Sequence, residues 1–569
     1  MAGPPVVLDS RGQVIPSQAI AQIRQRGAGG RRGMGASLSG RGPNGMFPYD
    51  ASAFSSQEFS DWFPITRSAD SEINPFRDRI AGRARDLYRN DAWAKGAIGR
   101  ILDSTIGSSY RPVSKPDYRA LSLENPKFDA VWADEYRRAA EALWRNYAND
   151  LGRWNDVGRR MTVSQQFRIA LGHKLVDGES LIVAQWRPDR IARTGARYAT
   201  CFQGVDPDRL SNPFQQMDTK HMRGGVELDD DDVAIAYWIR KAHQFDTYNA
   251  TESMTWERVA REDPEDGWQR VYHDYDPERF GQSRGISVFA PVIGRLKLLA
   301  KYYGIKLQQE TIASAFGVYV TSPFDHEMVA AALDDPEDEQ AGWSWYQDMR
   351  SDFHKERGLD ITGAKMATLA PGEKIESVSP SGNTGEFSPF VQEMLRGVGQ
   401  VLGLSGEQVT NDSSSSSWSA MRGGIAESEK TFLRRTQDFD INTAMPIWAT
   451  WMEEPFELGE LPLPSGYIPS FAEMRTAYAR CHFLGTPRGW VDPVSERQGE
   501  VLGMAAGFST LESVCARQGA DWEENLDQRG VEMRRMEKLG LPFPQWMNST
   551  AGGGETATES AAKPKTQEA

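Results

Sequence analysis

Residues Ser287 to Ala313 read SVFAPVIGRLKLLAKYYGIKLQQETIA, and their apolar positions recur at the spacing of one helical face. We therefore predict an amphipathic helix, which at 1.5 Å per residue would be about 40 Å long. Two lysines, Lys297 and Lys301, fall on the opposite face. The apolar positions are Val288, Val292, Leu296, Leu299, Tyr303 and Leu307.

Further along the chain, a second amphipathic helix is predicted from Phe387 to Leu402. The polar stretch from Gly403 to Trp418 follows it, and its composition is incompatible with a buried core. A third long helix is predicted to begin near Ser419 and to meet Pro446 before Trp448 and Trp451. The polar stretch ends with Ser413, Ser414, Ser415, Ser416, Ser417 and Trp418.

The segments around these helices have mixed character. Between the first two we predict a compact unit with strands at 318–321 and 364–370 and a helix at 339–355. After a proline-rich link at Leu461, a final helical module is predicted at 468–545. Ahead of Ser287 we predict one α+β domain, with helices at 74–107, 126–148 and 161–176 and strands at 180–186, 198–205, 233–243 and 268–275. Asn74-Pro75 would cap the first of these helices.

Bulk properties bound the class of protein. A chain of 569 residues is expected to form three or four structural units. The formal net charge of -14 argues against a protein that grips nucleic acid over its whole surface, although an acidic wall would let DNA slide. Cys201, Cys481 and Cys515 lack the spacing of a zinc site or a disulfide framework, so we expect synthesis in a reducing cytoplasm. No signal peptide or membrane span is predicted.

Both ends of the chain have a composition typical of flexible tails. The first fifty residues hold six arginines and two aspartates and are rich in glycine, so they form either an arm that contacts DNA or an acidic scaffold, or a solvated tail. Residues 549–569 are expected to be disordered.

Motifs for catalysis are weak. Gly358 to Lys365 (GLDITGAK) approaches a phosphate-binding loop, but Ala364 interrupts the glycine-lysine step and no hydroxyl residue follows the lysine. The acidic run Asp229–Asp232 is typical of a solvated turn, and His173 of a structural histidine. No serine lies in a Gly-x-Ser-x-Gly elbow. We therefore expect no enzyme and no catalytic, metal-binding or cofactor-binding residues.

Six blocks of sequence occur in a recognisable order: RARDLYRNDAWAKGAIGRILDSTIGS (83–108), GVDPDRLSNP (204–213), GQSRGISVFAPVIGRLKLLAKYY (281–303), LAPGEKI (369–375), LRGVGQVLGLSGEQV (395–409) and GWVDPVSERQGEVLGMAAGFSTLESVCARQGADWEE (489–524). In this order they resemble the lambda-type family of phage portal proteins. The resemblance extends roughly from Arg83 to Pro542, but the termini and residues 244–266 depart from the family pattern.

The resemblance implies an α+β portal fold with a mixed α/β wing, a two-helix stem, a small α/β clip, a long wing helix and a helical crown. It also implies a ring of twelve subunits at one capsid vertex of the virion, forming the channel for DNA packaging and ejection. The implied segments are a basic arm and extension (1–73), first part of the wing (74–286), stem helix (287–313), clip (314–386), stem helix (387–402), tunnel loop (403–418), long wing helix and linker (419–467), crown (468–545) and tail (546–569).

Implied partners are the terminase motor, major capsid and scaffolding proteins, head-completion or adaptor proteins, and double-stranded DNA that passes without sequence specificity. No membrane is implied. The alternative is another virion assembly component, such as a minor capsid or adaptor protein.

Several residues have two interpretations in such a ring. Lys297 and Lys301 would form belts of positive charge facing the lumen, or would only aid solubility. Ser413–Ser417 would contact phosphates in a loop flanked by Gly403, Gly406, Gly423 and Gly424 and anchored by Trp418, or would be a plain linker. In the clip, Trp343, Trp345 and Tyr346, next to acidic residues 334–339, would pack subunits together or dock the motor.

Overall fold

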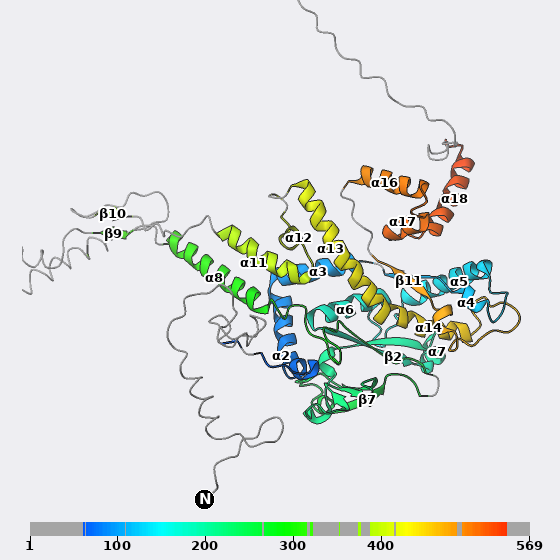
Figure 1. The fold of residues 1–569 in the computed structure, drawn as a ribbon, viewed down its shortest axis with the longest axis horizontal. Coiled ribbons are helices and arrows are strands. Elements are labelled where there is room, and N and C mark those ends of the chain that lie inside the picture. Colours follow the sequence, from blue (N-terminus) through cyan, green and yellow to red (C-terminus); the bar gives the residue numbers. More distant parts are fainter. Residues whose placement is uncertain are drawn as a thin grey trace, which may run out of the picture. The chain divides into compact units, whose positions relative to one another are not determined.

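The computed structural model describes residues 61–62, 64–108, 110–264, 267–315, 319–321, 352, 374–376, 387–412, 414, 417–485 and 492–542. The basic arm, the C-terminal tail, the clip aromatics Trp343, Trp345 and Tyr346, and the near phosphate loop 358–365 lie outside these residues. The fold described below is that of the unit that begins at Ser68. Its elements are shown in Figure 1.

Two helices replace the single helix predicted at 74–107. The first, α2 (Ala69–Asn90), begins earlier because Ser68 caps it, and Pro75 lies inside the helix. The prediction that Asn74-Pro75 caps the helix is therefore wrong. Asp91 separates α2 from α3 (Ala92–Thr105): its backbone is extended, and its carboxylate accepts a hydrogen bond from the Ala94 N–H at 2.8 Å.

The next helices confirm the sequence predictions with later starting points. After the short α4 (Tyr118–Leu121) comes α5 (Ala130–Ala148), which Asp129 caps. A reciprocal capping box between Thr162 and Gln165 begins α6 (Val163–Val176). The last turn of α6 leads through Gly178, as expected, directly into a strand.

Two antiparallel sheets follow. One has the order β3-β2-β8, with β2 (Glu179–Trp186), β3 (Thr200–Val205) and β8 (Val271–Tyr275), and a short helix α7 (Pro188–Thr194) connects β2 to β3. The other has the order β4-β5-β6-β7, with β4 (Met222–Arg223), β5 (Val226–Leu228), β6 (Ala234–Arg240) and β7 (Trp256–Ala260). Strand β7 was not predicted, and it lies in the stretch where the family resemblance departs. The 3₁₀ turns are η2 (Pro207–Arg209), η3 (Pro213–Gln215) and η4 (Glu252–Met254).

The two predicted rods are present and lie side by side (Figure 1). The first, α8 (Ile293–Ala315), begins six residues later than predicted, because Ser287 to Val292 form turns in which Ser287 accepts a hydrogen bond from the Phe289 N–H. The second, α11 (Phe387–Leu402), matches its predicted bounds. Between them, β9 (Tyr319–Thr321) pairs with β10 (Lys374–Glu376), and β9 confirms the strand predicted at 318–321.

The long helix continues through Pro446. It consists of α13 (Trp418–Phe439), a π turn η6 (Asp440–Ala444) and α14 (Met445–Glu457). Pro446 does not end it, because the π turn changes the hydrogen-bond register just before the residue that lacks an N–H. Inside this turn, burial raises the pKa of Asp440 to about 7, and the Tyr110 hydroxyl donates to its carboxyl group.

Residues after the long helix correct the prediction of a helical module at 468–545. The first part belongs to the main core: Phe471 and Tyr478 are fully buried, the latter in the short helix α15 (Arg475–Tyr478). Strand β11 (Cys481–Leu484) then pairs with β1 (Arg111–Ser114). The module is helical only from Pro493, as α16 (Pro493–Ala505), α17 (Leu511–Arg517) and α18 (Trp522–Leu539). Periodicity missed this because pairing with a strand nearly four hundred residues away leaves no local signal.

The main core is aromatic and lies between α5, the β3-β2-β8 sheet and α14. Trp448 and Trp451 of α14 are fully buried, and Trp144 packs edge-on against both, with ring centroids 5.2 and 5.0 Å away. No described helix is both long and apolar enough to cross a lipid bilayer.

Candidate functional site

The two rods pack through one face of each helix. Their contact includes the rings of Tyr302 and Phe390, whose centroids are 5.1 Å apart. The buried apolar side chains of this face are Leu296 and Leu299 on α8, and Val391, Leu395, Val398 and Leu402 on α11. The buried stripe of α8 therefore ends earlier than predicted. Leu307 is 70% exposed, because periodicity identifies a face but not whether a neighbour covers it.

The opposite face of α8 is cationic. Lys297 and Lys301 are exposed, as predicted. Four basic residues against the single acid Glu310 give α8 a formal charge of +3, in a chain whose net charge is -14. The four are Arg295, Lys297, Lys301 and Lys306, and only Lys306 pairs with Glu310, at 3.0 Å. This helix therefore concentrates positive charge on an exposed surface of an acidic protein.

The polar segment 403–418 is partly ordered by its own side chains. Ser405 and Gln408 form a capping box at α12 (Gly406–Thr410). Asp412 then accepts a hydrogen bond from the Ser414 N–H at 2.9 Å. Ser417 caps α13 by accepting a hydrogen bond from the Ala420 N–H at 3.3 Å. Ser413, Ser415 and Ser416 lie outside the described residues.

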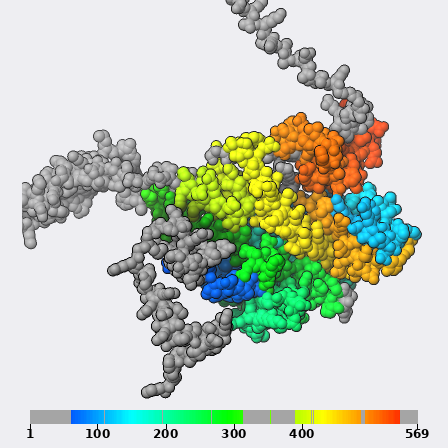
Figure 2. Space-filling view, viewed as in Figure 1, coloured from blue at the N-terminus to red at the C-terminus, as the bar shows by residue number. Residues whose placement is uncertain are grey.

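Two expectations about this segment are wrong for the single chain. Trp418 does not anchor the loop by packing, because it is the first residue of α13 and is 55% exposed. Gly423 and Gly424 lie within α13, which is exposed on the face seen in Figure 2 (yellow), and do not flank the loop. Gly403 does mark its start, with a φ of 71° where the chain leaves α11.

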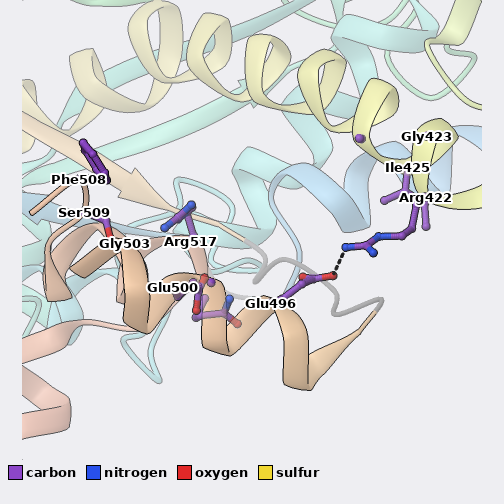
Figure 3. A pocket seen from close by; sticks show the side chains of 12 residues that line it. Arg422, Gly423, Ile425, Glu496, Glu500, Gly503, Phe508, Ser509 and Arg517 are labelled. Atoms are coloured by element: carbon purple, nitrogen blue, oxygen red, sulfur yellow. Dashed lines mark ion pairs between the residues drawn. The ribbon is translucent and has the colours of Figure 1, made fainter. Parts of the chain in front are cut away.

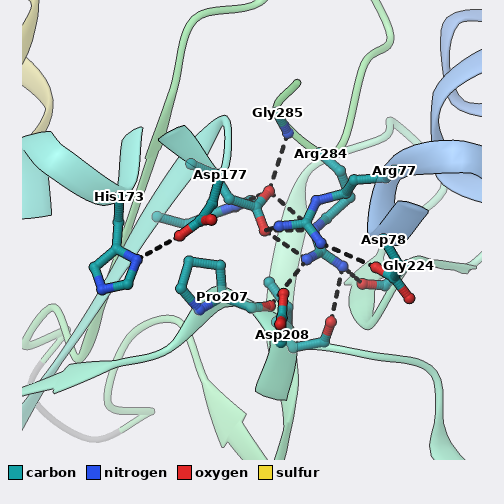
Figure 4. A network of polar contacts seen from close by, with 12 residues as sticks. Arg77, Asp78, His173, Asp177, Pro207, Asp208, Gly224, Arg284 and Gly285 are labelled. Atoms are coloured by element: carbon teal, nitrogen blue, oxygen red, sulfur yellow. Dashed lines mark hydrogen bonds and ion pairs between the residues drawn. The ribbon is translucent and has the colours of Figure 1, made fainter. Parts of the chain in front are cut away.

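The connection into α8 is anchored by a buried carboxylate, Glu179 at the start of β2. Arg77 of α2 donates to it at 2.8 Å, and Arg284 donates from Nε at 2.9 Å and from Nη2 at 2.5 Å; both arginines are labelled in Figure 4. His273 Nε2 lies 3.1 Å away, and the Gly285 N–H donates at 3.0 Å. The two guanidinium groups and the carboxylate are all buried.

The ionised state of Glu179 is set by its partners. Burial by itself acts to raise the pKa of this carboxyl group, but Arg284 and Arg77 outweigh it and hold the pKa well below its usual range. Arg284 also donates to the carbonyls of Leu210, Gly224 and Pro207. One network therefore ties α2, both sheets and the segment before α8 together.

Two glycines let the backbone of this segment pass closely. A Cβ on Gly285 would lie 2.6 Å from the carbonyl carbon of Gly178 and 2.8 Å from Cβ of Tyr275. Gly178 has a φ of 97°, and a Cβ there would lie 2.6 Å from Cα of Ile286. The contacts with Gly178 and Ile286 are to backbone atoms, which cannot move aside as a flexible side chain can. The direction in which the chain enters α8 is thus fixed sterically as well as electrostatically.

A neighbouring polar cluster is arranged around Arg85. Its guanidinium donates to Asp177 at 2.6 Å, to Asp206 at 2.8 Å and to Asp208. Asp206, Asp208 and His243 lie close enough to share an ion, and Arg85 already pairs with both carboxylates. His173 is structural, as predicted, and contacts Asp177 at 2.5 Å.

The other candidate sites give no catalytic arrangement. The acidic run forms a turn in which Asp229 accepts hydrogen bonds from the N–H groups of Asp231 and Val233, as expected of a solvated turn. A cavity of about 610 Å³ lies between α13 and the C-terminal helices (Figure 3), where Arg422 faces Glu496 at 4.0 Å. Its walls are largely those of two exposed helices, and no described nucleophile is paired there with a base.

Known proteins similar to this chain are phage structural components. The family described as phage portal protein, lambda family, matches residues 55–436. The portal protein of Escherichia phage N15 is 28% identical over 488 residues, 85% of this chain and 89% of that protein. Portal protein B of Escherichia phage lambda is 28% identical over 516 residues, 89% of this chain and 94% of that protein. A chain in the solved neck of a native GTA particle, computed with C12 symmetry, gives a TM-score of 0.34 at 13% identity, covering 76% of this chain and 96% of that one.

The family match and the two portal proteins define the class as a structural protein of the phage particle. Because the family match spans more than half of the sequence, the chain belongs to the lambda family of phage portal proteins. It is therefore a subunit of the portal ring in the virion and not an enzyme. The alternative of a minor capsid or adaptor protein is thereby set aside.

The anchor around Glu179 was missed by sequence reasoning. Its partners come from three distant stretches, at Arg77, His273 and Arg284, and no spacing rule connects them. The sequence offers only two hints that a charged group is buried here. A carboxylate directly follows Gly178 at the start of an apolar strand, and an arginine stands between a serine and a glycine in SRG at 283–285.

Proposed function

We propose that rings of this subunit enclose the channel through which double-stranded DNA is packaged and ejected, with the cationic face of α8 bordering the lumen. The observation that carries the proposal is the +3 charge of α8 in a chain of net charge -14. A twelvefold ring would repeat Lys297 and Lys301 as two belts. Many weak, equivalent phosphate contacts would guide a moving duplex without holding it at one register.

In this proposal α8 and α11 form the stem, residues 314–386 the clip, 403–418 the tunnel loop, and α13 to α14 the long wing helix. The wing includes residues 74–286. We would begin the crown at Pro493 and not at residue 468, because Phe471, Tyr478 and β11 belong to the main core. Docking of the terminase motor, the scaffolding and capsid proteins and the head-completion proteins to clip, wing or crown is proposed from the family resemblance.

Reversing the charge of both lysines should impair packaging. In Lys297→Glu/Lys301→Glu each subunit would repel phosphates where it now attracts them, so we expect about tenfold fewer genome-filled particles. Rings should still form, because both side chains are exposed and neither contributes to the contact with α11. The measurement is a count of filled particles in a complementation assay, with electron microscopy of the purified protein to show open-centred rings.

The matched control is Lys241→Glu, which changes one exposed charge per subunit after β6 and should leave packaging unchanged. Normal numbers of filled particles from the double variant would exclude a lumen role for this face. Purified protein without an open-centred ring would exclude the channel altogether.

We further propose that the serines at 413–417 in the tunnel loop contact the DNA backbone, and that this loop moves as the DNA advances. Short hydroxyl side chains donate to phosphate without reading sequence. Replacing residues 413–416 with a proline-rich sequence should reduce DNA packaging or retention by about tenfold while rings still assemble, because a stiff loop cannot follow the duplex. Ser417 is kept because it caps α13. Loss of this cap would lower the stability of the fold by about 1 kcal/mol, an effect unrelated to DNA contact.

A matched variant with glycine and serine in place of residues 413–416 should package normally, since it keeps the loop flexible. Filled particles at the normal level from the proline-rich variant would reduce this segment to a plain linker.

A further inference from the structure

The C-terminal helices, α16 to α18 in residues 492–542, have almost no core of their own. They attach with little apolar burial to the main body, the described residues from Ser68 to Gly485. Neither α16 nor α18 contains a buried residue. Among the described residues 492–542, the buried ones are Val514 and Asp521. Large apolar side chains of this module are instead exposed, including Leu502 of α16 at 68% and Phe508, between α16 and α17, at 91%. Apolar burial is the usual source of stable packing between helices, so another interaction must hold this module in place.

That interaction is ionic. Glu523 pairs with Arg137, and with Arg138 at 3.4 Å. Glu524 pairs with Arg145, and with Arg111 at 2.8 Å. A further pair joins Glu512 of α17 to Lys115. In every one of these pairs the acid belongs to the C-terminal helices, and the base belongs to α5 or to β1 and the residue after it.

The acidic partner is preformed at the start of α18. Asp521 caps the helix, and its carboxylate accepts hydrogen bonds from the N–H groups of Glu523 at 2.7 Å and Glu524 at 3.3 Å. Two acids in the first turn also lie at the positive end of the helix dipole, which stabilises the turn whether or not it is docked. The sequence Asp521-Trp522-Glu523-Glu524 is thus a compact negative surface that needs no refolding to bind.

The surface between the two parts is loosely filled. A cavity of about 490 Å³ lies there, lined by residues of both sides. The main body contributes Arg111, Glu141 and Arg145, and the C-terminal helices contribute Gly519, Asp521 and Glu524. Water in such a space screens the neighbouring ion pairs, several of which are already partly exposed.

We propose that the basic face of α5 and β1 is a reversible docking surface for the acidic first turn of α18, so that the C-terminal helices undock as ionic strength rises while the main body stays folded. Screening determines the salt concentrations at which these ion pairs weaken, because the Debye length falls from about 8 Å near physiological salt to about 3 Å at 1 M. The main body does not share this sensitivity, because its aromatic core and its Glu179 network are buried.

Hydrogen exchange of the intact, assembled protein tests the proposal. We expect backbone amides of α17 and α18 to exchange about tenfold faster at about 1 M NaCl than at about 0.05 M, with those of β2 and β3 unchanged. Glu523→Lys/Glu524→Lys should show the fast exchange already at low salt. The control Glu532→Lys/Glu537→Lys makes the same charge change on exposed turns of the same helix and should keep the salt dependence of the original chain.

A charge swap separates docking from mere helix stability. Arg111→Glu/Arg145→Glu should undock the helices, and adding Glu524→Lys to this pair of changes should restore slow exchange at low salt. Exchange in α17 and α18 that is independent of salt would overturn the proposal. So would equal effects of the two Glu-to-Lys double variants, or a charge swap that fails to restore protection.

Discussion

Glu179→Gln is expected to destabilise the subunit by about 3–5 kcal/mol, enough to remove most of the folded protein at 37 °C. The glutamine keeps the shape but removes the negative charge that contacts both Arg77 and Arg284. Arg77 would keep only its pair with the exposed Asp78, and Arg284 would contact no carboxylate among the described residues. One of the two oxygens that accept from Arg77, Arg284 and the Gly285 N–H would become an NH2 group, which can only donate. The free energy of unfolding, measured by urea denaturation, tests this expectation.

The control is Glu227→Gln, which makes the same chemical change in a pair between Glu227 of β5 and Arg258 of β7, on an exposed part of the β4-β5-β6-β7 sheet. It should cost less than about 1 kcal/mol, because water replaces the lost contact. Equal losses from the two variants would show that burial does not decide the effect.

The dependence on pH has a definite sign. Since the pKa of Glu179 is lowered in the fold, its contribution is present above the pKa of the unfolded chain and is lost as pH falls through the lower, folded value. The difference in stability between the original chain and Glu179→Gln should therefore shrink in strong acid.

Gly285→Ala should cost about 3 kcal/mol or more, and it should disturb the direction in which the chain enters α8. The added carbon would overlap the backbone of Gly178, and removing this overlap requires the backbone at Gly178 and the segment before α8 to move apart. We expect a lower free energy of unfolding, and rings that are fewer or irregular by electron microscopy.

Gly294→Ala is the matched control on α8 itself. A Cβ there meets no atom within 4 Å, so alanine should raise the stability of the isolated subunit by about 0.5–1 kcal/mol through helix propensity. A well-formed ring and unchanged stability from Gly285→Ala would contradict the role given to this close approach.

The outcomes of the sequence predictions have local physical reasons. The helix at 387–402 was predicted to the residue, because an apolar stripe determines where a helix must pack. The start of α2 was missed, since Ser68 offers a cap six residues before the more conspicuous Asn74-Pro75. Lys297 and Lys301 are exposed, as their place on the polar face of the helix predicts. Trp418 was expected to pack against the loop but is exposed in the single chain.

What the sequence determined by itself was the order of rods, strands and polar segments, and the family to which that order belongs. Periodicity, caps and turn residues act over a few positions, and a chain must satisfy them locally before it packs. What only the tertiary structure decided was which distant side chains meet. The carboxylate of Glu179 collects Arg77, His273 and Arg284, and acids at 512–524 meet bases at 111–145. Such contacts depend on how the elements pack in three dimensions. The distance between these residues along the sequence does not indicate that packing.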